Sequence, residues 1–206
     1  MTPQALILLA VLTQSPCVDP TDPTTDTPQS RAALAATCRA VIKAHPQDTG
    51  AYLVLGYATI DKPAEALEAY LAGLRVAPDN FELLVNAGLT YKQVGRLEEA
   101  LAALAHAARV DTTDADALVQ AGLVAHRLNR YNQAVQLFRH ALKRHQDGPT
   151  WGYMARSLRA LGRDADAVRA WDRAEHLSPH GFIDEAGDRA DYNDSRVKLG
   201  LAHVSP

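Results

Sequence analysis

A repeat of 34 residues dominates this chain. Ala66, Ala100 and Ala134 are each separated by 34 residues, and Ala167 continues the series one residue early. A fixed period of this length, with small and bulky residues returning at the same offsets, is typical of stacked helical hairpins. One hairpin cannot bury its apolar face alone, so neighbouring repeats must pack against each other. The sequence therefore predicts an all-α fold whose core continues from repeat to repeat.

Small residues recur where two helices must approach closely. Gly88 and Gly122 occupy the same place in the first helix of two consecutive hairpins. A glycine inside a helix costs roughly 1 kcal/mol relative to alanine, so its return at this place indicates a packing requirement. Gly95 and Asn129 stand in the turns between the helices, where a residue suited to left-handed backbone is expected.

The recurring positions resemble the tetratricopeptide repeat family. The resemblance covers residues 49–180 in four units, 49–80, 81–114, 115–147 and 148–180. It implies paired antiparallel helices, stacked into a right-handed superhelix with a concave inner face. Trp151 and Trp171 fall on motif positions, and we interpret both as core residues rather than ligand platforms. The motif residues of the outer segments are Tyr52, Leu55, Gly56, Ala66, Tyr70, Gly73 and Pro78, and Trp151, Leu158, Ala167, Trp171, Ala174 and Pro179.

The segments that flank the four units extend the array. Residues 30–48 resemble a second helix without its first, with Ser30 as the N-cap of an N-terminal packing helix. Together with four hairpins, this predicts nine helices before the tail. Cys38 falls where the motif requires a buried side chain and is expected to be a core thiol. Residues 181–206 lose the repeat phase and are expected to form a polar C-terminal cap or a frayed tail.

The first 29 residues differ in composition from the repeats. An uninterrupted apolar run of eight residues, 5–12, is too short to span a bilayer but fits the hydrophobic region of a secretory signal. Residues 18–29 are rich in Pro, Thr and Asp and are expected to form an extended linker. Residues 1–17 resemble a bacterial lipoprotein leader, which implies lipidation of Cys17. Pro16 and the missing basic n-region depart from that pattern, and ordinary cleavage after Cys17 or a wrongly chosen start codon stay open.

Charge, cysteine content and motifs exclude several classes of function. The chain has 21 basic and 24 acidic residues, without the basic excess that nucleic-acid binding requires. Two cysteines do not make a disulfide framework. The sequence contains no phosphate-cradling glycine motif, no His-Glu-x-x-His and no nucleophile elbow, and its eight histidines are scattered. We therefore expect no catalytic site, no cofactor and no metal.

The family resemblance implies a binding site on the concave face. Members of the family contact ligands through the first helix of each hairpin, on the side turned away from the packing glycine. In this chain the resulting groove would change from apolar to basic, which suits a protein or peptide with an apolar anchor and an acidic end. The alternative is that the basic residues form an ordinary solvated surface. The partner-binding residues predicted in this way are Leu53, Tyr57, Val85, Asn86, Leu89, Lys92, Gln120, His126, Arg127, Arg156 and Arg159.

Two function classes follow from these observations. The first is a non-enzymatic scaffold in the bacterial cell envelope, exported or held to the membrane only through its N-terminus, that binds a protein or peptide and supports assembly of a larger complex. The second is a cytoplasmic adaptor whose N-terminus is mis-started or binds a partner. An accessory domain of an enzyme is a more distant alternative. Of the chaperone-binding clamp found in some family members, only Asn86 is present, so a chaperone C-terminus is not the expected ligand.

Overall fold

The structure is a computed structural model that describes residue 17, residues 27–178 and residues 186–202. These residues form ten α-helices and no strand, and nine of the helices precede the tail, as predicted. The chain divides into two compact units, Met1–Val94 and Gly95–Pro206. The predicted leader over residues 1–16 and most of the predicted linker lie outside the described residues.

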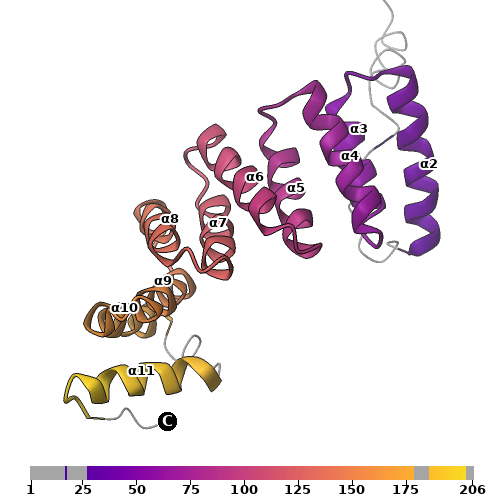
Figure 1. The fold of residues 1–206 in the computed structure, drawn as a ribbon. Helices are drawn as coiled ribbons and strands as arrows, with labels where there is room; N and C mark the ends of the chain where they lie inside the picture. Colours follow the sequence, from indigo (N-terminus) through magenta and orange to yellow (C-terminus); the bar gives the residue numbers. More distant parts are fainter. Residues whose placement is uncertain (1–16, 18–26, 179–185, 203–206) are drawn as a thin grey trace, which may run out of the picture. The chain divides into compact units, whose positions relative to one another are not determined.

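The first unit contains four helices that pack in chain order (Figure 1). The lone helix α2 packs against α3, α3 pairs with α4, and α4 packs against α5. Helix α2 lies in the segment predicted as a packing helix, and α3 and α4 form one hairpin. The bounds are α2 Pro28–Ala44, α3 Thr49–Ala58, α4 Pro63–Val76 and α5 Phe81–Gln93.

The second unit continues the same pattern. Helices α6 to α10 each pack against the next helix in the chain, and α11 packs against both α10 and α9. Helix α11 lies within the predicted polar C-terminal segment. The bounds are α6 Leu97–Val110, α7 Asp116–Arg127, α8 Tyr131–Arg144, α9 Gly148–Ala160, α10 Asp164–Leu177 and α11 Ala186–Lys198.

Side-chain caps fix where the helices begin. Asp48, Asn80 and Asp147 each accept a hydrogen bond from a backbone N–H in the first turn of α3, α5 and α9. The start of α2 differs from our expectation, because the N-cap is Thr27 and not Ser30. Ser30 instead completes a capping box, in which its hydroxyl accepts a hydrogen bond from the Thr27 backbone N–H.

The glycines of the first helices allow close approach of a neighbouring ring. A Cβ atom on Gly122 would lie 2.6 Å from the Cε1 atom of Phe138, closer than two carbon atoms can approach. Phe138 is fully buried. The turn residues Gly95 and Asn129 have φ angles of 80° and 58°, which confirms the predicted left-handed backbone.

The two tryptophans differ in burial. Trp171 is fully buried between helices of the second unit, as predicted for a core residue. Trp151 is only half-buried and lines a surface groove, so its assignment to the core was wrong. The repeat position predicts that a side chain faces the neighbouring helices. Whether an indole is fully buried there also depends on the size of the side chains on the adjacent second helices.

The two cysteines form a disulfide bond. Cys17 and Cys38 have Cα atoms 5.0 Å apart, and both residues are buried. Cys38 therefore lies in the core, as expected, but as half of a disulfide and not as a free thiol. The expectation failed because the leader pattern set Cys17 apart from the array. The lipidation predicted for Cys17 would use the same sulfur atom, so an acylated Cys17 and this disulfide are mutually exclusive.

Candidate functional site

In each unit, the residues predicted to contact a partner form a stripe, mostly half-buried, on the first helices. Buried residues alternate with them along these helices. The first unit holds Leu53, Tyr57, Val85, Asn86, Leu89 and Lys92, all half-buried. The second unit holds Gln120, His126, Arg156 and Arg159, which are half-buried, and Arg127, which is exposed.

In the first unit the stripe is mainly apolar. Leu53 and Tyr57 on α3 and Val85 and Leu89 on α5 supply most of its surface. The side-chain amide of Asn86 donates a hydrogen bond of 2.8 Å to the Glu82 carbonyl oxygen within its own helix.

The disulfide covers one end of the face of α3. Val54 occupies the same repeat position as Asn86 and Gln120 in the next two repeats. Unlike them, it is buried, in a cluster with Cys17 and Cys38. The Cys17 Sγ atom lies 3.7 Å from the carbonyl oxygen of Ala51. Cys17 therefore packs on apolar residues of α2 and α3.

In the second unit the stripe includes a polar contact between α7 and α9. The Nδ1 atom of His126 lies 2.8 Å from the hydroxyl oxygen of the buried Ser157. The His126 ring also stands edge-on to Tyr131, with ring centroids 5.1 Å apart. Burial, and secondarily the nearby charge of Arg156, lower the pKa of His126 below its ordinary value. The imidazole is therefore neutral at neutral pH.

The basic residues of this stripe are engaged within the chain to different degrees. The Arg156 guanidinium lies over the Tyr153 ring, 5.6 Å from its centroid. Arg159 forms ion pairs with Asp191 at 3.2 Å and Asp194 at 2.8 Å, both on α11. We predicted that Arg159 binds the acidic end of a ligand, but carboxylates of α11 already occupy its guanidinium group.

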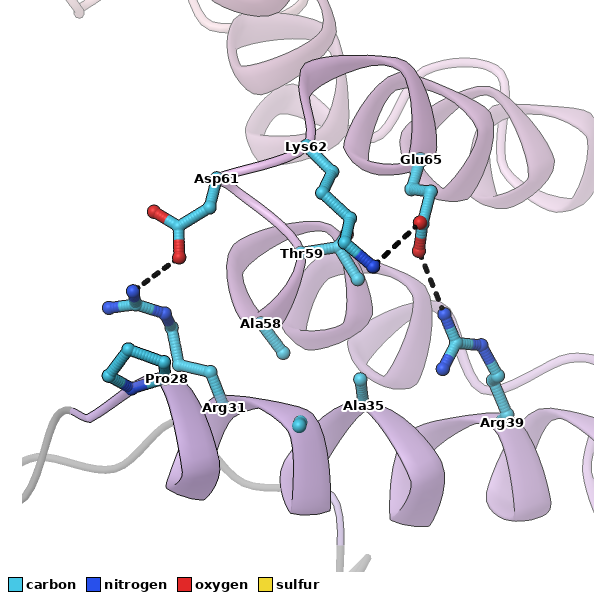
Figure 2. A pocket seen from close by; sticks show the side chains of 10 residues that line it. Pro28, Arg31, Ala35, Arg39, Ala58, Thr59, Asp61, Lys62 and Glu65 are labelled. Atoms are coloured by element: carbon cyan, nitrogen blue, oxygen red, sulfur yellow. Dashed lines mark hydrogen bonds and ion pairs between the residues drawn. The ribbon is translucent and has the colours of Figure 1, made fainter.

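A pocket of about 230 Å³ lies beside α2, outside the predicted stripe. Figure 2 shows Arg31 directed at Asp61, while Arg39 and Lys62 converge on Glu65. The Arg39–Glu65 and Lys62–Glu65 pairs are 3.2 and 3.0 Å long. The Arg39–Glu65 pair connects α2 to the start of α4, whereas Lys62–Glu65 lies within the start of α4 itself. The charges of this pocket are therefore largely matched by their neighbours.

Two features are absent from the described part of the chain: a cluster of metal-binding side chains and a helix that could span a membrane. No three His, Cys, Asp or Glu side chains gather there in a way that could hold a metal ion. None of the described helices has both the length and the apolar character that crossing a bilayer requires.

The repeated geometry has a counterpart among known families. Residues 81–114 and 115–146 match the family model of the tetratricopeptide repeat. Residues 81–146 of this chain therefore carry two tetratricopeptide repeats. Proteins built from tetratricopeptide repeats are generally non-enzymatic scaffolds that bind other proteins or peptides. A comparison with curated proteins finds no match.

Solved tetratricopeptide repeat structures share the fold. A crystal structure of MamA has a TM-score of 0.69 and 18% identity, covering 78% of this chain and 95% of that chain. A MamA AMB-1 structure has a TM-score of 0.64 and 25% identity, covering 72% and 90%. YrrB, described as a TPR protein with an unusual peptide-binding site, has a TM-score of 0.68 and 17% identity, covering 74% and 80%.

Sequence reasoning missed three features near the stripe. The Cys17–Cys38 bond was hidden by the leader pattern, although two cysteines in the chain were a signal to test the pair. The contact of α11 with Arg159 was missed because the acidic residues after residue 180 were interpreted only as a solvating cap. The groove beside Trp151 was missed because the motif assigned that residue to the core.

Proposed function

We propose that the chain is a non-enzymatic scaffold that binds a protein or peptide through the half-buried stripe of its first helices. The observation that carries the proposal is the recurrence of this stripe at equivalent positions on α3, α5, α7 and α9, beside residues that are fully buried. Packing holds such a face in place before binding, which reduces the ordering cost on the side of the protein. The peptide-binding site of YrrB, a structure with the same fold, supports this class of ligand.

The proposed ligand has an apolar part and an acidic part. The apolar part would contact the first unit, where Leu53, Tyr57 and Leu89 offer half-buried surface. The acidic part would contact the second unit through Arg127 and Arg156, because arginine matches carboxylate geometry. Arg159 is no longer included in this set, since Asp191 and Asp194 already pair with it.

We further propose that the scaffold works in an oxidising compartment, in agreement with the cell envelope expected from the leader pattern. A buried disulfide supports this location, because disulfides persist in secreted and periplasmic proteins and are rare in the reducing cytosol. The cytoplasmic adaptor is the alternative. The disulfide also favours a mature chain that keeps Cys17 without an acyl group.

A pull-down from native extract tests the binding stripe. The Arg127→Glu/Arg156→Glu variant should lose its partner or release it at lower salt, because exposed ion pairs are screened within about 8–10 Å at physiological ionic strength. The matched control is Arg109→Glu/Arg144→Glu, which changes the same charge at the ends of α6 and α8. If the folded Arg127→Glu/Arg156→Glu variant retains its partner as the wild type does, and at the same salt concentration, these two arginines do not contribute to binding.

Mass measurement of the native protein tests the location. The expected protein retains Cys17, lacks an acyl chain and carries the Cys17–Cys38 bond under non-reducing conditions. Two free thiols on a chain recovered from the cytosolic fraction would support the adaptor instead. A mass increase that corresponds to a lipid on Cys17 would contradict the disulfide and support the lipoprotein alternative.

A further inference from the structure

Two surface grooves occur at equivalent places in the two units. The first, called here the α2–α4 groove, has a volume of about 520 Å³ and lies between α2 and α4 with α3 as its floor. The second, the α8–α10 groove, has a volume of about 410 Å³ and lies between α8 and α10 with α9 as its floor. In each case two successive second helices form the walls and one first helix closes the bottom.

The floors of the two grooves use the same repeat positions. Tyr52 in the first groove corresponds to Trp151 in the second, and each ring is held by a residue at the end of the preceding second helix. The Tyr52 hydroxyl donates a hydrogen bond of 3.1 Å to the Pro46 carbonyl oxygen, and the Trp151 Nε1–H donates one of 3.0 Å to the Gln146 side chain. The aromatic residue is therefore fixed in both grooves, but Trp151 presents the larger and more exposed ring.

The walls of the two grooves differ in charge. The positions of Glu68 and Ala72 on α4 are taken by Arg169 and Arg173 on α10. The α2–α4 groove has two basic and two acidic side chains, whereas the α8–α10 groove has three arginines and a single acid, Asp166. The same architecture is thus electrically balanced in the first unit and strongly basic in the second.

The single acid of the α8–α10 groove, Asp166, is shared among several arginines. Asp166 accepts a 2.8 Å hydrogen bond from Nε of Arg163, outside the groove, and also pairs with Arg169. The Arg163 hydrogen bond is the main reason why the pKa of Asp166 lies below its ordinary value. The charge of Arg139 also acts on Asp166, but among the described residues no ion pair or hydrogen bond is formed by Arg139 or Arg173, one on each wall. Two exposed guanidinium groups therefore border an apolar floor.

We propose that the α8–α10 groove is a second binding surface, for an acidic peptide segment that carries one bulky apolar side chain. The apolar side chain would lie on Trp151 and Met154, and carboxylates before and after it would meet Arg139 and Arg173. Arginine suits this task because its planar fork pairs with carboxylates in a bidentate manner. This surface is formed by α8, α9 and α10, and it does not include any residue of the stripe on which the proposed function rests.

The occupant follows from charge and shape together. A neutral apolar peptide would leave the two arginines beside apolar surface with no partner in the ligand, and a purely acidic peptide would leave the indole uncovered. A segment with both features would cover the indole and pair with both arginines. The α2–α4 groove, with Glu68 in place of Arg169, would repel the same segment, so one high-affinity site per chain is expected.

The test uses a synthetic heptapeptide, acetylated and amidated, with a central phenylalanine flanked by three aspartates on each side. Binding is measured by calorimetry and by tryptophan emission. The chain has two tryptophans and Trp171 is fully buried, so a change in emission reports on Trp151. The matched control peptide has asparagine in place of every aspartate.

Three proteins are compared with the peptide: the wild type, the Arg139→Glu/Arg173→Glu variant and the Arg127→Glu/Arg156→Glu variant of the stripe. The proposal expects one site in the wild type, a change in emission, and an affinity at least about tenfold lower for the groove variant or the control peptide. The stripe variant should bind as the wild type does. Circular dichroism and thermal unfolding check that each variant is folded.

Two results would overturn the proposal. One is undetectable binding to the wild type at millimolar peptide. The other is equal binding by the groove variant, with or without a loss in the stripe variant, because the peptide would then lie elsewhere. A loss confined to the stripe variant would support the proposed function while refuting this groove, so the two ideas fail separately.

Discussion

Cys17 is bonded to Cys38 across 21 residues of sequence, and this bond holds Cys17 against α2 and α3. The buried cluster around it includes Val41, Ala51 and Val54, with Leu34 packed at its edge. In the middle of a repeat array another helix covers such a surface. Here Cys17 covers part of it, so this residue belongs to the buried core of the first unit.

Removal of the disulfide should weaken the first unit. Cross-linking residues this far apart restricts the unfolded chain, and its loss typically costs about 2–4 kcal/mol. We expect the Cys17→Ser/Cys38→Ser variant to lower the denaturation midpoint and to speed hydrogen exchange in α2 and α3. Exchange in α8 to α10 is the internal control. Unchanged exchange in α2 and α3 would show that the bond adds nothing to the stability of this unit.

The sequence was sufficient for the array because its signals are local and repeated. Gly122 and Asn129 could be placed correctly since a close approach and a left-handed turn each require a particular residue type. The partners of Cys17 and Arg159 could not be placed. Each depends on a segment outside the repeat phase folding back onto the array, and a periodic pattern carries no information about such a contact.

Alanine at Gly122 should destabilise the second unit. Its methyl group would meet the ring of Phe138, which is fully buried and has no free space to move into. Overpacking of this kind costs about 1–3 kcal/mol, measured by chemical denaturation. If the ring is the cause, Gly122→Ala should cost less when it is introduced into a Phe138→Leu background. Additive effects of the two substitutions would contradict the proposed contact.

The docking of α11 should depend on Tyr192. Its ring packs on Trp171 with centroids 5.8 Å apart, and its hydroxyl donates a hydrogen bond to Asp172. We expect Tyr192→Ala to release α11 and shift the emission of Trp171 to longer wavelength, because water would reach the indole. A Trp151→Phe background isolates this signal, since the chain has two tryptophans.

The matched control for α11 is Tyr192→Phe, which keeps the ring and removes only the hydroxyl. Its emission should stay close to that of the parent protein. If Tyr192→Ala also leaves the emission unchanged, the packing on Trp171 does not hold the helix in place. The ion pairs of Arg159 with Asp191 and Asp194, and the hydrogen bond from Ser195 to Asp164, would then be tested next.

The pH dependence of stability should contain a contribution from His126. Burial, and then the charge of Arg156, depress its pKa in the folded protein below the ordinary value of 6.5. The unfolded chain therefore binds more protons than the folded chain as the pH falls through 6.5, and stability must decrease with falling pH over that window. We expect the denaturation midpoint of the wild type to decrease as the pH is lowered from neutral to mildly acidic, and that of His126→Gln to decrease less.

NMR titration of the imidazole measures the pKa of His126 directly. Because burial is the larger cause of its shift, Arg156→Ala should raise this pKa only part of the way to the ordinary value. A His126 resonance that titrates at or above 6.5 in the wild type would contradict the buried contact with Ser157.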